Sequence, residues 1–246
     1  RLESMGSFET LEAWGRWLSE PGSWTGGFDF PFGLPRELVE HEGWPLDWLA
    51  CMRVYSSFPR DEIRQRFASF CNHRPVGRKF AHRATDSPAG SSPSMKWVNP
   101  PVAFMLHAGV PRLIDAGVHL PRLHDGDRGR VALEAYPGLL AREVLGFRSY
   151  KSDDRARQTQ ERLRARQDLI AALQQGHTRL GLSLHLSAAQ RDALVEDGSG
   201  DRLDAVLCAL QAGWALRAHE RGDPHYGLPP CDPLEGWIVT ADIAPP

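Results

Sequence analysis

The chain has 246 residues, of which 41% are hydrophobic, and its 29 Lys and Arg residues nearly balance its 31 Asp and Glu residues. This size suits one large domain or two small ones, and the even charge excludes a global basic field, so a nucleic-acid site would have to be local. No apolar run approaches the ~20 residues of a membrane span, and no secretory signal opens the sequence.

The first elements are predicted to be a strand and a helix. Residues 2–8 alternate loosely and could form a strand that enters from a missing N-terminal segment. Residues 7–22 have helical spacing, with Ser7 or Thr10 as the cap and Pro21-Gly22 as the end.

The stretch "TGGFDFPFG", residues 25–33, is predicted to be a buried strand. Its apolar residues on both sides are typical of a strand covered on both faces. Asp29 interrupts it, and a lone buried carboxylate costs several kcal/mol unless something pairs with it. The nearest following cation is Arg36, beyond a proline-rich turn, so we expect Asp29 to be a metal ligand.

Helical and irregular segments follow in turn. Helices are predicted over 36–43, 46–58, 60–72 and 102–118, with a long irregular insertion over about 73–101. Such insertions in a compact domain are often functional.

The second half is predicted to hold one buried strand and several helices. The strand is "RVALEAYPG", residues 130–138, with Glu134 near its end. The remaining expected elements are helices over 139–146, 152–176, 187–198 and 200–222, and a terminal edge strand over 235–242. The helix over 152–176 is rich in arginine.

Four acids stand out against these elements. Asp29 and Glu134 lie in the two buried strands, and Asp201 and Asp204 share one face of the first turn of the last long helix. Each one alone has a simpler explanation as a cap or an ion-pair partner. Together in one cleft they would repel, and a hard divalent cation such as Mg²⁺ or Mn²⁺ would relieve that repulsion.

The pieces "GGFDFPFGLP", "MKWVNPPV", "VALEAYPG" followed by "YKSDD", and "GDRLDAVLCALQA" resemble the family catalogued as domain of unknown function 429. The last piece also looks like the C-terminal helix of RuvC-type resolvases. The resemblance implies a predicted nuclease, with an α/β, ribonuclease H-like mixed sheet flanked by helices. It covers residues 1–246 as a single domain, in which the first strand or strands are expected to be missing.

The resemblance also implies roles for the acids. Asp29 corresponds to the acid of the family's fourth strand, Glu134 to that of the fifth, and Asp201 and Asp204 to those of the last helix. All four would be catalytic, with Asp29, Asp204 and Asp201 holding Mg²⁺ or Mn²⁺. No counterpart of the first-strand acid is visible. Either the segment that carries it lies upstream of Arg1, or this chain cannot build the full metal site.

Basic residues give candidates for substrate contacts. The chain has only three lysines among its 29 basic residues, and a sequence that mostly uses arginine can keep lysine where a compact ammonium is needed. The expected phosphate-binding residues are Arg78, Lys79, Arg83, Lys96 and Lys151. A solvated basic loop is the competing interpretation for residues 74–83.

Two functions remain open at this point. One is a metal-dependent nuclease that hydrolyses phosphodiester bonds of DNA or RNA. The other is a non-catalytic module on the same fold, with an incomplete metal site, that binds nucleic acid, a nucleotide or a protein. Because the cysteines at 51, 71, 208 and 231 lack zinc spacing, we expect reduced thiols and a cytoplasmic protein.

Overall fold

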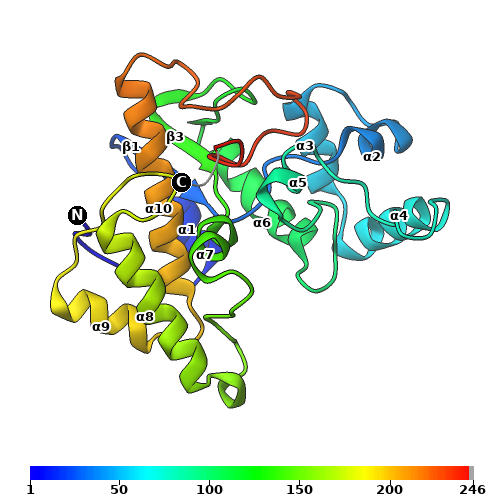
Figure 1. Cartoon of the computed structure of the whole chain (residues 1–246). Coiled ribbons are helices and arrows are strands. Elements are labelled where there is room, and N and C mark those ends of the chain that lie inside the picture. Colours follow the sequence, from blue (N-terminus) through cyan, green and yellow to red (C-terminus); the bar gives the residue numbers. More distant parts are fainter. Residues whose placement is uncertain (244–246) are drawn as a thin grey trace.

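The computed structural model describes residues 1–243 (Figure 1). In chain order its elements are α1 (Leu11–Leu18), β1 (Trp24–Phe28), α2 (Arg36–His41), α3 (Trp48–Ser57), α4 (Arg60–Asn72), α5 (Asp86–Ala89), α6 (Val102–Asp115), β2 (Val118–His119), β3 (Asp127–Glu134), α7 (Pro137–Leu145), η1 (Arg155–Arg157), α8 (Gln160–Gln175), α9 (Ala188–Glu196) and α10 (Asp201–Glu220). The chain is therefore mixed α/β, as the sequence predicts.

The sheet of residues 1–243 is small and parallel. Its strand order is β1-β3-β2, and β1 pairs with β3 so that Phe28 lies opposite Glu134. We expected a mixed sheet with further strands over 2–8 and 235–242, and both of these segments are irregular. The second still contacts β3, because Val239 N donates to Glu134 O at 2.9 Å.

Helices cover both faces of the sheet. Val131 and Leu133 of β3 pack against α10, whereas Ala132 between them packs into the core built by α2 to α6. This alternation is the two-residue period of a strand. Figure 1 shows α10 passing β1 and β3. A Cβ on Gly27 would lie 2.4 Å from Cys208 O, so the glycine at this position of β1 lets α10 approach the strand closely.

A second core joins the C-terminal helices. Leucines of α7, α8 and α10, among them Leu140, Leu169 and Leu203, pack together beside the sheet. Helix α8 begins at Gln160 and not near 152 as predicted, because Thr159 Oγ1 caps it by accepting from Arg162 N at 3.4 Å. The one-turn η1 lies before this break.

The other helices follow the predicted pattern. Thr10 caps α1, Ser187 caps α9 with a complete capping box, and residues 73–101 are irregular apart from the single turn of α5. Across residues 1–243, no helix combines the length and the apolar character that crossing a bilayer requires.

Candidate active site

Three acids converge at the carboxyl end of the sheet. Asp29 follows β1 directly, and Glu134 ends the neighbouring strand β3. The prediction that these two lie on adjacent strands, near the same sheet end, is therefore confirmed. The first turn of α10 brings Asp204 to the same region, and the charge of Asp204 acts on Asp29.

Asp29 is a partly buried carboxylate without a direct partner. Among residues 1–243, no side chain or backbone group donates a hydrogen bond to it, and no cation lies within ion-pairing distance. Burial, and after it the charge of Asp204, raises the pKa of Asp29 to about 6. Its protonation therefore changes near neutral pH.

Asp204, in contrast, is fully engaged. It is 7% exposed, and its carboxylate accepts hydrogen bonds from Tyr150 Oη and Lys151 Nζ. Burial raises the Asp204 pKa, and the Lys151 charge opposes that rise. Gly200 makes the contact possible, because its φ is +80° and a Cβ there would lie 2.6 Å from Lys151 Cβ.

A cavity of about 530 Å³ opens in front of these acids. Asp29 and Lys151 line it together with Tyr136, Arg142, Arg148 and Tyr150. Arg142 lies on α7, where it donates to Ala89 O at 2.6 Å and to Tyr136 Oη at 3.1 Å. The lining also holds the paired Arg83 and Glu134 and the exposed Asp153, so four cations face three carboxylates, an arrangement that can accept an anionic substrate.

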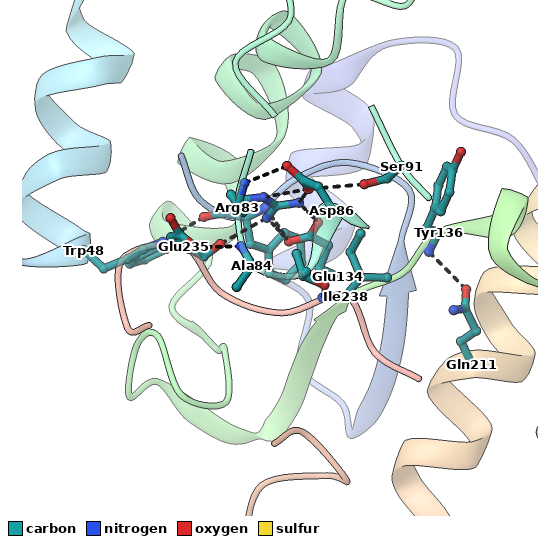
Figure 2. Close-up of polar contacts among 12 residues, drawn as sticks. Trp48, Arg83, Ala84, Asp86, Ser91, Glu134, Tyr136, Gln211, Glu235 and Ile238 are labelled. Carbon is teal, nitrogen blue, oxygen red and sulfur yellow. Dashed lines mark hydrogen bonds and ion pairs between the residues drawn. The ribbon is translucent and has the colours of Figure 1, made fainter. Parts of the chain in front are cut away.

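Glu134 lies in a buried ion-pair network (Figure 2). Its two carboxylate oxygens accept from the Arg83 guanidinium at 2.7 and 2.6 Å, and Phe32 N donates to it at 2.9 Å. Arg83 also binds Asp86 at 3.0 Å. Because Arg83 is 2% exposed and Glu134 4%, the two form a buried ion pair that stabilises this part of the fold. Both also line the cavity, and their expected substrate and catalytic roles stay predictions.

The same network ties distant segments together. Arg83 Nη1 donates to Glu235 O at 3.0 Å, and the Glu235 carboxylate accepts from Ala84 N and from Arg36 N, both at 2.9 Å. Irregular segments from two parts of the chain are thereby fixed to the end of β3 (Figure 2). This explains how a long insertion holds one conformation without secondary structure.

The remaining predicted residues lie elsewhere. Asp201 is exposed and accepts from Ser199 Oγ at 3.0 Å. Lys96 Nζ donates to Asn99 O at 2.5 Å, and Lys79 lies over the rings of Phe80 and Trp97, at 5.6 and 5.9 Å. Arg78 and Lys79 line a separate hollow on the surface of the insertion. Of the five expected phosphate-binding residues, only Arg83 and Lys151 are among the lining residues of the cavity.

The sequence interpretation missed three cavity residues, which are Tyr150, Arg142 and Arg148. Tyr150 precedes Lys151 and could have been found by asking which group satisfies a buried Asp204. The two arginines belong to α7 and the loop after it, directly beyond the strand that carries Glu134. In parallel α/β sheets this strand-to-helix connection is where ligands bind, which is the signal that could have identified them.

Carboxylates are the type of ligand that a hard divalent cation prefers, but few of them meet at this site. Within residues 1–243, no group of three or more Asp, Glu, His or Cys residues is arranged to hold a metal ion. Asp29 and Asp204 remain, and Mg²⁺ is commonly bound by one or two carboxylates with waters and substrate phosphates completing its shell. A cation at this pair would require Lys151 to leave Asp204.

Comparison of the chain with protein-family models, with curated proteins and with solved structures finds no match to any of them. The assignment of a function therefore depends on the geometry of this cavity.

Proposed function

We propose that the chain is a divalent-metal-dependent phosphodiesterase that hydrolyses nucleic acid in the cavity of Asp29 and Lys151. The observation that carries the proposal is the Asp29 carboxylate, which is partly buried, unpaired within residues 1–243 and close enough to Asp204 to feel its charge. Keeping such a group costs stability, so a protein retains it where a ligand needs it.

The proposal includes a ribonuclease H-like fold. The parallel pairing of β1 with β3, and the acids at one end of both strands, support it. Asp29 and Asp204 would hold Mg²⁺ or Mn²⁺, which when bound supplies Lewis-acid activation of water and of a phosphoryl oxygen.

The chain's own residues would position the substrate. Lys151, Arg142 and Arg148 line the cavity and would bind the scissile phosphate and its neighbours. Tyr150 Oη donates to Asp204 and keeps that carboxylate in place. Since burial raises the Asp29 pKa to about 6, its ionised form predominates above that pH, and activity should rise as pH increases through 6.

A second candidate function is binding without catalysis. Lys151 neutralises the charge of Asp204, and Arg83 neutralises the charge of Glu134. The cavity can therefore bind an anion without a bound metal ion. On this alternative the protein is a nucleic-acid or nucleotide-binding module with an incomplete metal site.

Two measurements on the purified chain separate these functions. Labelled single-stranded and duplex DNA and RNA are incubated with Mg²⁺, with Mn²⁺ or with EDTA, and Mn²⁺ binding is measured by calorimetry. Metal-dependent cleavage that Asp29→Asn abolishes, while the exposed control Asp192→Asn retains it, supports the nuclease. Nucleic-acid binding with neither cleavage nor Mn²⁺ binding supports the module.

A further inference from the structure

A second hollow continues from the cavity toward helix α8. It has a volume of about 770 Å³ and shares Arg148 and Ser149 with the cavity. Arg157, Arg162 and Arg164 line it farther out, with Glu161. We call this second hollow the α8 groove.

The α8 groove is strongly cationic. Four arginines line it against a single acid, Glu161. Two of them have weak or exposed partners, because Arg148 pairs with Asp168 at 2.7 Å on the surface and Arg157 lies 3.4 Å from Asp154. Within residues 1–243, Arg164 has no ion-pair partner. Surface pairs of this kind contribute little and exchange readily for a phosphate.

Local sequence gives the groove its shape. The chain turns between η1 and α8, and Arg162 Nη1 donates to Arg157 O at 2.6 Å across that turn. Arg166, one turn farther along α8, is buried instead and donates to Tyr150 O at 2.7 Å. The arginines of this helix thus divide into one that anchors α8 beside the candidate active site and others that face solvent.

One exposed aromatic side chain is a sequence neighbour of the residues that the two hollows share. Phe147 has a relative exposure of 106% and lines neither hollow itself, but it directly precedes Arg148, which lines both. A fully solvated phenyl ring gains nothing in the folded protein, whereas an unpaired nucleobase could stack on it.

We propose that the α8 groove and Phe147 bind a single-stranded nucleic acid and lead it into the cavity of Asp29. This inference rests on the proposed function and names its substrate as an unpaired strand of several nucleotides. A mononucleotide would fill one hollow only. A duplex would keep its bases away from Phe147, and an acidic peptide would meet the arginines without using the ring.

The test measures binding without metal, so that it does not depend on catalysis. Fluorescence anisotropy in EDTA follows single-stranded DNA and RNA oligomers of about 2 to 12 nucleotides over a range of salt concentrations. Binding is expected to tighten with length and to weaken with salt. Arg157→Ala/Arg164→Ala should reduce the salt slope by about 1.4, since each phosphate contact on a single strand contributes about 0.7.

The matched control is Arg217→Ala/Arg221→Ala, which removes the same charge from exposed positions of α10 and beyond its end. It should leave the slope unchanged. Phe147→Leu should weaken binding at least about five-fold, and Phe147→Tyr should retain it, because only the ring can stack.

Three results would overturn the inference: equal losses in the two arginine variants, equal affinity for a duplex, or equal affinity for a polyglutamate peptide. Binding that follows the expected pattern, together with no cleavage in Mn²⁺, would instead remove only the nuclease proposal. The two failures are therefore distinguishable.

Discussion

The ammonium of Lys151 lies against the carboxylate of Asp204, beside the cavity that the unpaired Asp29 also lines. Burial lowers the Lys151 pKa, but the charges of Asp204 and Asp29 outweigh burial and raise it, so the ammonium stays charged at neutral pH. The negative charge of Asp204, which would attract a metal ion, is therefore already neutralised by Lys151.

Lys151→Met should consequently tighten Mn²⁺ binding. Removing the ammonium leaves Asp29 and Asp204 without a nearby cation, and one unit charge at this range is worth several kcal/mol at an effective dielectric of about 20. We expect a gain in Mn²⁺ affinity of at least about ten-fold, measured by calorimetry near pH 8. Lys96→Met, which changes the same charge outside the cavity, should leave the affinity unchanged.

Asp29→Asn should stabilise the metal-free protein at neutral pH. The folded-state pKa of about 6 lies above the ordinary value, so the folded protein holds the proton more tightly. Stability is then lost as pH rises from about 4 through 6. The substitution should add about 3 kcal/mol near pH 7.5, and less than about 1 kcal/mol near pH 4, in urea unfolding with EDTA. An equal effect at both pH values would contradict the assigned pKa.

Arg83→Met should destabilise the protein by about 3–5 kcal/mol, because it leaves Glu134 and Asp86 buried without their cation. Lys79→Met, an exposed change of the same kind, should stay within about 0.5 kcal/mol. Chemical unfolding of both variants measures the difference. If Arg83→Met cost no more than the control, the buried pair would not contribute to stability.

Gly27→Ala should separate α10 from β1 and weaken the whole site. Its Cβ would lie 2.4 Å from Cys208 O, a backbone atom that cannot move without the helix. We expect a loss of more than about 2 kcal/mol, together with weaker Mn²⁺ binding. Gly213→Ala, in the same helix with nothing within 4 Å of its Cβ, should instead raise stability by up to about 1 kcal/mol. Thermal unfolding of the Gly27→Ala and Gly213→Ala variants measures both changes in stability.

The sequence by itself determined the main helices, the strands β1 and β3 and two of the acids. Helical spacing and caps located α1, α9 and α10, and the apolar runs located β1 and β3 with Asp29 and Glu134 at one end. These features depend on neighbouring residues, whose pattern is written locally. The same local reasoning missed the start of α8 at Gln160, because the Thr159 cap competes with an unbroken helix.

Only the tertiary structure decided which charges meet. Arg83 pairs with Glu134 across 51 positions, and Lys151 reaches Asp204 across 53. Nothing in a local pattern distinguishes these cations from Lys79 or Lys96, which remain at the surface of the insertion. Burial decides which cation pairs with which acid, because a carboxylate removed from water needs the cation that the packing of the helices places beside it. Asp29 lies where no cation of residues 1–243 comes within ion-pairing distance, and the charge of Lys151 acts on it from farther away.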